Sequence, residues 1–292
     1  MQRPVAITLG LFIVFIVFLP FSSRGISDTV HDAVLYVGGT GPGNYSSIQA
    51  AVNNATAGAT IVVYNGTYHE CLIIEKSLIL TGENKNNTII DGGGNEFVVT
   101  LTAGHITISG FTITQSEKKF PFAGIYIISN YNTISNNILT DNFYGMQLGY
   151  ATGYNLIISN TIFHNGRCGV YFNHSSSNRL IGNVVRDHPV NGFGLFEFSN
   201  NNTLMNNTFS ENRYSGVNIR ESYDNQVIGN TFIQDQVGLH KPSPEYRTVA
   251  RDNIFSQNAI SFEEERDAIV FTAVIFDILV CIVFLVFRKR FA

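Results

Sequence analysis

The sequence predicts an all-β fold, a single-stranded right-handed parallel β-helix, on three observations. A polar pivot recurs along the chain at intervals of 23 or 24 residues. Apolar and polar residues alternate in short segments around each pivot, which is the period of a β-strand. Gly, Asn, Ser and Thr take many places where Lys and Glu usually stand, and only 14% of the residues are charged. Short strands repeated at a fixed interval indicate a solenoid.

The recurring pivot is an asparagine. Its six positions are Asn136, Asn160, Asn183, Asn207, Asn230 and Asn253. After most pivots a glycine opens a second apolar segment, such as GMQL at 145–148. One such unit cannot bury its own apolar side, so it stacks on the next unit, with strands paired at ~4.8 Å. We expect the six asparagines to form a structural ladder, with left-handed backbone at the turn and side-chain amides bonded from coil to coil.

A short helix is expected before the first coil. Within residues 46–58, Ile48, Ala51 and Val52 have helical spacing behind a serine, and Gly58 closes the segment. Solenoids need terminal caps that hide the exposed core and the strand edges. The sequence therefore predicts an amphipathic N-terminal capping helix, followed by coils with a weaker repeat.

Both ends of the chain are apolar. Residues 1–25 combine an early arginine, an apolar run and small residues, which predicts a signal peptide or an uncleaved signal anchor. Residues 268–287 supply about 20 apolar residues, enough for a transmembrane helix. The basic residues after them place 288–292 in the cytoplasm. We therefore expect 26–262 to be an extracytoplasmic domain on the cell membrane, in a single-pass protein, or a two-pass one if the N-terminal segment is retained.

Charge and cysteine content exclude some classes of protein. The net charge is −4 and the pI is near 6.0, and no basic run occurs before the extreme C-terminus, so no nucleic-acid partner is expected. Cys281 lies in the expected span, while Cys71 and Cys168 lie in different repeats. No disulfide framework is predicted.

Alignment of the coils gives two polar columns on the outer surface. The first, four residues after the pivot, contains His164, Asp187 and Glu211, with His188 beside it. The second, fourteen residues after the pivot, contains His174, Glu197 and Glu221, with Arg220 beside it. Except for His188, these residues are candidates for ligand binding. Acid and base groups must converge on one sugar bond, and Glu197, Glu221, Asp187 and His188 are the catalytic candidates. A plain solvated surface is the alternative.

No metal site or cofactor is predicted. Copper sites need Cys, Met and His in close clusters, and the seven histidines are scattered along the chain. The acidic residues likewise lack the spacing of a calcium site. Asp277, in the middle of the apolar span, either bonds to its own helix or pairs with a membrane partner.

The opening stretch YSSIQAAVNNATAGATIVVYNGTYHECLIIEKSLILTGENKNNTIIDG, followed by N.I..N......G... coils, resembles NosD-like right-handed β-helix proteins. These belong to the broad pectin-lyase-like group, and the resemblance covers about residues 34–260. The resemblance implies the fold. Its members include carbohydrate-binding modules, polysaccharide lyases, epimerases, membrane-tethered prokaryotic and especially archaeal surface proteins, and a periplasmic factor in copper-site assembly that works with an ABC transporter.

Three hypotheses of function follow. The favoured one is a non-enzymatic, membrane-anchored surface protein whose rigid face binds a glycan or a protein, such as a surface polysaccharide or glycoprotein. The second is a polysaccharide-modifying enzyme, either a lyase, a hydrolase or an epimerase. The third is an accessory factor for a membrane transporter or for metalloenzyme maturation.

Overall fold

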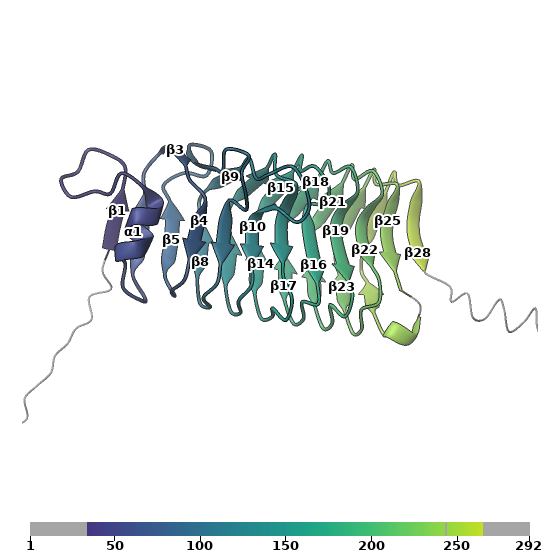
Figure 1. The fold of residues 1–292 in the computed structure, drawn as a ribbon. Coiled ribbons are helices and arrows are strands. Elements are labelled where there is room, and N and C mark those ends of the chain that lie inside the picture. The colour runs from purple at the N-terminus through teal and green to yellow at the C-terminus, as the bar shows by residue number, and fades with distance from the viewer. Residues whose placement is uncertain (1–33, 243, 265–292) are drawn as a thin grey trace, which may run out of the picture. The chain divides into compact units, whose positions relative to one another are not determined.

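The structure, a computed structural model, describes residues 34–242 and 244–264 and has them as a parallel β-helix (Figure 1). Each full coil contributes one strand to each of three sheets, here named A, B and C. Every strand pairs in parallel with its counterparts in the neighbouring coils, and not with the next strand along the chain. The predicted β-helix fold is confirmed.

The three sheets run the length of the described solenoid. Sheet A contains β1 (Val34–Val37), β2 (Thr60–Val63), β5 (Ile79–Gly82), β8 (Thr107–Ser109), β11 (Thr133–Ser135), β14 (Leu156–Ile158), β17 (Arg179–Ile181), β20 (Thr203–Met205), β23 (Gln226–Ile228) and β26 (Val249–Arg251). Sheet B contains β3 (Gly66–His69), β6 (Thr88–Asp91), β9 (Thr112–Thr114), β12 (Ile138–Thr140), β15 (Thr161–Phe163), β18 (Val184–Arg186), β21 (Thr208–Ser210), β24 (Thr231–Ile233) and β27 (Ile254–Ser256). Sheet C contains β4 (Leu72–Ile74), β7 (Val99–Leu101), β10 (Ala123–Ile127), β13 (Tyr144–Leu148), β16 (Val170–Asn173), β19 (Asn191–Phe196), β22 (Ser215–Ile219), β25 (Val237–Lys241) and β28 (Ile260–Glu264). A short 3-10 helix, η1 (Pro244–Tyr246), precedes the last coil.

The predicted capping helix is confirmed as α1 (Ile48–Asn54). Ser47 caps it, because its hydroxyl accepts a hydrogen bond from the Ala50 N–H at 3.1 Å. Ile48, Ala51 and Val52 are buried on one face and belong to the hydrophobic core. The helix therefore covers the apolar interior at the N-terminal end of the solenoid (Figure 1).

The core is a set of stacked apolar side chains inside the coils. In the three-residue strands of sheets A and B, the middle residue points inward and is almost always fully buried, as Ile157 and Ile162 are. Aromatic residues continue the stack in sheet B, where the Phe209 and Phe232 ring centroids are 5.3 Å apart. Burial of these side chains at every coil supplies the main stabilising free energy.

Three buried ladders of polar side chains line the corners between the sheets. The AB ladder contains Asn137, Asn160, Asn183, Asn207, Asn230 and Asn253. The BC ladder contains Asn142, Asn165, His188, Asn212, Asp235 and Asn258. The CA ladder contains Asn132, Asn155, Asn178, Asn202 and Asn225. Each ladder satisfies backbone groups that the turn leaves outside the sheets.

The expected asparagine column is wrong at its first member, which is Asn137 and not Asn136. The AB ladder begins at Asn137, whose Nδ2 lies 3.3 Å from the Asn160 Oδ1. Asn136 lies outside the ladder and accepts a hydrogen bond from Lys85. The left-handed backbone also belongs to the residue before each ladder position, such as Asn136 at φ 52° and Ser159 at φ 56°. Two adjacent asparagines made both registers possible in the sequence.

The glycines that open the sheet C strands are required by close packing between coils. A Cβ on Gly192 would lie 2.7 Å from the Gly216 carbonyl oxygen and 3.1 Å from the Phe209 ring. Both distances are shorter than ordinary van der Waals contact. The sharp corner from sheet B into sheet C therefore excludes a side chain at this position.

The two expected membrane segments cannot be compared with this structure. Neither described range, 34–242 or 244–264, contains a helix long and apolar enough to cross a membrane. The expected signal segment at 1–25, the expected span at 268–287 with Asp277, and the tail at 288–292 lie outside the described residues.

Candidate functional site

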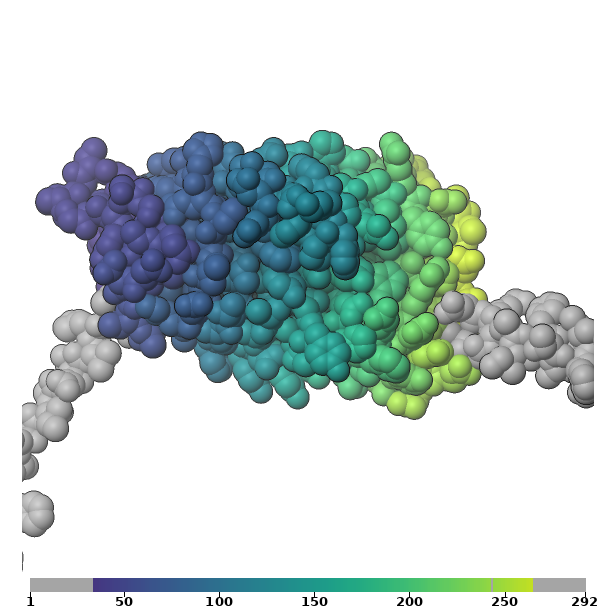
Figure 2. Space-filling model, viewed as in Figure 1, coloured from purple at the N-terminus to yellow at the C-terminus, as the bar shows by residue number. Residues whose placement is uncertain are grey.

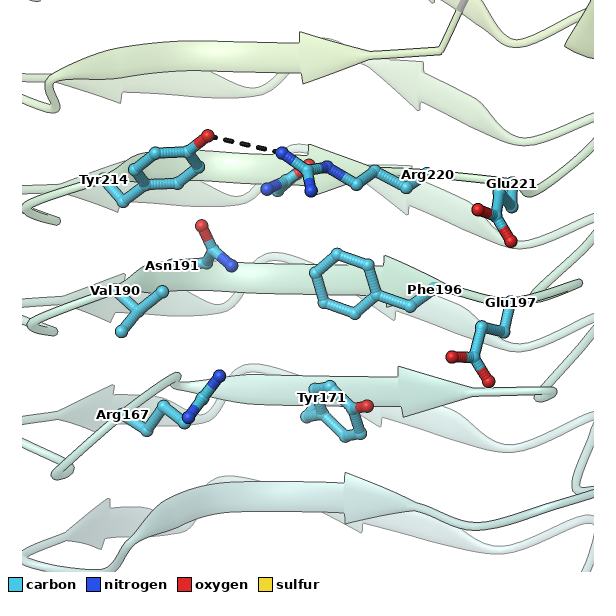
Figure 3. A pocket seen from close by; sticks show the side chains of 10 residues that line it. Arg167, Tyr171, Val190, Asn191, Phe196, Glu197, Tyr214, Arg220 and Glu221 are labelled. Atoms are coloured by element: carbon cyan, nitrogen blue, oxygen red, sulfur yellow. Dashed lines mark hydrogen bonds between the residues drawn. The ribbon is translucent and has the colours of Figure 1, made fainter. Parts of the chain in front are cut away.

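A groove of about 480 Å³ lies on the outer face of sheet C, across three successive coils (Figure 3). It is formed by β16, β19 and β22 and by the residues just before and after these strands. Its lining residues are Arg167, Tyr171, Val190, Asn191, Phe196, Glu197, Tyr214, Asn218, Arg220 and Glu221. The strands are paired in register with their neighbours, so this surface is held by the rigid part of the fold.

Two aromatic rings form part of the groove floor. Tyr171 of β16 and Phe196 of β19 have ring centroids 5.6 Å apart, and Tyr171 also stacks on Tyr144 of the preceding coil at 4.9 Å. A Cβ on Gly194 would lie 2.3 Å from the Phe196 ring. The absence of a side chain at Gly194 therefore lets the Phe196 ring lie against the sheet.

Two buried amides form the polar part of the floor. Asn191 accepts a hydrogen bond from the Ser215 hydroxyl at 2.7 Å. Asn218 is only 3% exposed, and its side-chain Oδ1 atom is buried without a hydrogen-bond partner. A buried acceptor of this kind is costly to leave unpaired. Protein atoms cover this oxygen, so it does not face a molecule that enters the groove.

Charged and hydroxyl groups stand along the two edges of the groove. Arg167 and Tyr214 precede their strands, while Glu197, Arg220 and Glu221 follow theirs, as Figure 3 shows. The Arg220 guanidinium donates a hydrogen bond to the Tyr214 hydroxyl at 3.3 Å and so reaches across the groove. The groove thus contains both signs of charge.

The second predicted column supplies this site in part. Glu197 and Glu221 are neighbours across one coil step, since the Phe198 N–H donates to the Glu221 carbonyl oxygen. Arg220 lines the same groove. His174 contacts Glu197, with Nδ1 3.7 Å from Oε2, but it is not among the residues that line the groove.

The first predicted column lies elsewhere, at the corner between sheets B and C. His164 and Asp187 line a hollow of about 390 Å³ together with Lys118 and Arg213. The His164 Nδ1 is 3.0 Å from the Asp141 Oδ1, so these two side chains form an exposed ion pair when the histidine is protonated. Glu211 is exposed and lines neither hollow.

The role of His188 differs from the one expected, because it is a buried member of the BC ladder. Its Nδ1 lies 2.9 Å from the Asn212 Oδ1, which only accepts, and its Nε2 lies 3.2 Å from the Asn165 Nδ2, which only donates. The neutral ring with a proton on Nδ1 satisfies both contacts. Burial lowers the pKa of His188 to about 4. Both ring nitrogens are thus engaged in structure, which argues against His188 as a catalytic base.

The sequence alignment of coils missed the groove floor. Tyr171 and Asn218 occupy equivalent outward positions of sheet C. Both pair in register with Gly194, which lies in the strand between theirs. Outward alternation within each second strand was the signal that could have identified them. Phe196 requires the structure, since its ring lies over a glycine of its own strand.

Comparison with protein families matches residues 52–272 to the model of the periplasmic copper-binding protein (NosD). Comparison with curated proteins finds no match. Among solved structures, pectate lyase Pel9A superposes with a TM-score of 0.65 at 14% identity, over 81% of this chain and 79% of that one. An alginate lyase from Paenibacillus sp. str. FPU-7 gives 0.59 at 15% identity, over 75% and 96%. At such low identity these structures are similar in fold alone.

The side chains of the described residues do not fit a copper ion. No three His, Cys, Asp or Glu side chains within 34–242 and 244–264 lie close enough together to share a metal ion. Cys71 is exposed and Cys168 is buried, and Met146 is in the hydrophobic core. Copper requires a cluster of soft ligands, and the side chains of residues 34–242 and 244–264 do not form one.

Proposed function

The chain belongs to the NosD family, and from that premise we propose that it is an extracytoplasmic, membrane-tethered β-helix protein whose sheet C groove binds a glycan without altering it. The observation that carries this proposal is that one open groove combines two aromatic rings, Tyr171 and Phe196, with charged and hydroxyl groups along both edges. A saccharide presents both an apolar C–H face and hydroxyl groups. Rings and hydrogen-bonding side chains in one groove are complementary to both.

The groove suits a sugar ring. The faces of Tyr171 and Phe196 provide apolar surface for the C–H side of a saccharide, and the surrounding Arg, Glu, Asn and Tyr groups can bond to its hydroxyls. The groove is open and runs over several coils, which suits a chain of sugars better than a small metabolite. The partner class is therefore a surface polysaccharide or a glycoprotein.

The placement of the two carboxylates favours binding over chemistry. In glycoside hydrolysis two carboxyl groups flank the scissile bond. Glu197 and Glu221 both follow the C-terminal ends of their strands and stand on the same edge of the groove (Figure 3). From one edge they can hydrogen-bond to consecutive sugars.

The proposed membrane tether is inferred from the amino-acid sequence. Residues 268–287 are apolar and about long enough to span a bilayer, and basic residues follow them. A periplasmic family description agrees with an extracytoplasmic location. Asp277 would then be a contact point for a second membrane protein.

Glycan binding is tested with the full chain in detergent on a glycan array, followed by affinity measurement for each hit. We expect Phe196→Ala and Arg220→Ala to weaken binding by at least about tenfold, or about 1.4 kcal/mol. Tyr154→Ala, which removes an exposed ring outside the groove, is the matched control. Equal affinity of all three variants and the unchanged chain would overturn the proposal.

A polysaccharide-modifying enzyme is the second candidate, favoured by the presence of Glu197, Glu221 and Arg220 in one groove. The two functions are separated by Glu197→Gln and Glu221→Gln, singly and together. Binding without chemistry predicts retained ligand and no release of reducing ends by any form of the chain. Release that the double variant abolishes would establish the enzyme instead.

A further inference from the structure

The last described coil exposes apolar side chains on all three sheets. Val249 of β26 is 47% exposed, Ile254 of β27 is 62% exposed, and Phe262 of β28 is 42% exposed. Ile260, also in β28, is 46% exposed. On the outward positions of β26 and β27 the balance is unchanged from the coil before, where Gln226 and Thr231 stand beside Val249 and Ile254, and Ile228 and Ile233 stand beside Arg251 and Ser256. The difference lies in β28, because Ile260 and Phe262 pair with Val237 and Leu239, which are buried. The last coil thus exposes side chains at positions that belong to the core in the coil before.

The two ends of the described solenoid differ. At the first coil α1 covers the interior, whereas β26, β27 and β28 each stand last in their sheet. Within the part of the chain that the structure describes, one edge of each of these strands has no neighbour. Phe255 stacks on Phe232 at 5.0 Å and is only partly buried. In Figure 2 the yellow atoms of this last coil lie at the end opposite the purple first coil.

The apolar segment 268–287 begins very close to this end. Only residues 265–267 separate it from Glu264, the last residue of β28. Four peptide steps reach at most about 14 Å. The headgroup layer on each side of a bilayer is about 5–8 Å thick. If 268–287 spans the bilayer, the end of β28 therefore stays within about 14 Å of the hydrocarbon boundary, so the last coil lies next to the headgroup layer.

We propose that the last coil, bearing Val249, Ile254, Ile260 and Phe262, docks end-on against the lipid bilayer. This inference rests on the membrane tether of the proposed function. The four side chains enter the interface, where water and headgroups bond to the open strand edges. A lipid surface also fits the charges, because Glu264 pairs with Lys241 at 2.5 Å and Glu263 lies 3.4 Å from His240. Docking therefore does not require anionic lipid.

The lipid surface is favoured over a second copy of the chain. At the N-terminal end of another copy, β1, β3 and β4 stand last in their sheets, but α1 covers the apolar core that a stacked coil would have to meet. The C-terminal end of another copy carries the same apolar segment a few residues away and would be drawn to the same membrane. Stacking between copies is therefore an outcome that the experiment must distinguish.

The test uses tryptophan as a reporter, because the chain contains none. The full chain with Val249→Trp, Ile254→Trp or Phe262→Trp is reconstituted in phosphatidylcholine vesicles that contain doxyl-labelled lipid. Docking end-on predicts at least about a twofold loss of fluorescence for all three reporters, which lie on three different sheets. Tyr154→Trp, exposed near the middle of the solenoid, is the control and should be unaffected. Far-UV circular dichroism checks that each variant is folded.

Each other outcome overturns the inference. Flotation of the vesicles with the chain but without quenching of any reporter means that the tether holds and the coil does not dock. Quenching on one sheet only, or of Tyr154→Trp as well, means that the solenoid lies on its side. Crosslinking of copies through the last coil without quenching means end-to-end association. If the chain does not float with the vesicles, both the proposed membrane tether and the proposed docking are wrong.

Discussion

A single side chain decides how each rung of a buried ladder behaves with pH. An asparagine accepts through Oδ1 and donates through Nδ2, as Asn212 does toward Asp235 at 2.8 Å. Neutral His188 performs both roles with its two ring nitrogens. Asp235 accepts at Oδ1, but its Oδ2 is buried without a partner where the amides of other rungs donate. Asp235 is thus the one BC-ladder rung with an unpaired carboxyl oxygen.

Burial therefore raises the pKa of Asp235 to about 7, against an ordinary value of 3.8, and the charge of Glu211 adds to this effect. The folded chain holds the proton that the unfolded chain has released. The stability that protonated Asp235 contributes is complete below about pH 3.8 and is lost as pH rises to about 7.

We predict that Asp235→Asn raises the free energy of unfolding at pH 8 by about 1–4 kcal/mol, because the amide stays neutral and can donate. The gain should shrink toward pH 4. Urea denaturation of both chains at pH 4.5 and pH 8 measures it. Asp252→Asn, an exposed aspartate beside Arg251, is the control. A gain that does not change with pH would contradict this account of Asp235.

At the scale of one element, α1 depends on a residue from another coil. The Glu70 carboxylate accepts hydrogen bonds from the Ile48 N–H at 2.8 Å and the Gln49 N–H at 2.9 Å. These are free N–H groups of the first helical turn, which a helix cannot satisfy itself. At seven residues the helix is too short to be stable alone. Its position over the core is therefore set by packing and by this carboxylate.

We predict that Glu70→Ala lowers the free energy of unfolding by about 1–3 kcal/mol, since two N–H groups lose a charged acceptor. Glu75→Ala is the matched control, because Glu75 is an exposed glutamate at the other end of β4 and should change stability by less than about 0.5 kcal/mol. Equilibrium urea unfolding of the two variants compares them. Equal effects would show that Glu70 does not hold the helix.

At the scale of the whole molecule, each coil contacts only its neighbours, so local stability depends on position. Coils in the middle are covered on both sides, and the first coil is covered by α1. The last coil is covered on one side within the described residues, and β26 and β27 contain no fully buried residue. A one-dimensional stack of this kind opens from its weaker end.

Hydrogen exchange of the full chain in detergent should reveal this gradient. We predict that amides of β26, β27 and β28 exchange at least about tenfold faster than those of the middle coils, while β2 and β4, which pack against α1, stay protected. Mass spectrometry of peptides from the labelled chain resolves the three regions. Uniform exchange along the solenoid, or faster exchange at the N-terminal end, would rule out opening from the last coil.

The sequence alone was sufficient for the repeat, the β-helix and the capping helix, because each depends on local spacing. Alternation places side chains in or out of a coil, and Ile48, Ala51 and Val52 mark one helix face wherever that helix packs. Glu197, Arg220 and Glu221 were also found by alignment, since residues one coil apart become neighbours.

Only the tertiary structure decided the exact register and the floor of the groove. Asn136 and Asn137 are equivalent in a repeat pattern, and the choice between them is made by which amide reaches Asn160. His188 belongs to the interior because it continues a ladder, which no local pattern indicates. Tyr171, Phe196 and Asn218 line one groove only because three successive coils place their sheet C strands side by side. Such contacts join residues more than 20 positions apart, and small differences in coil length set them.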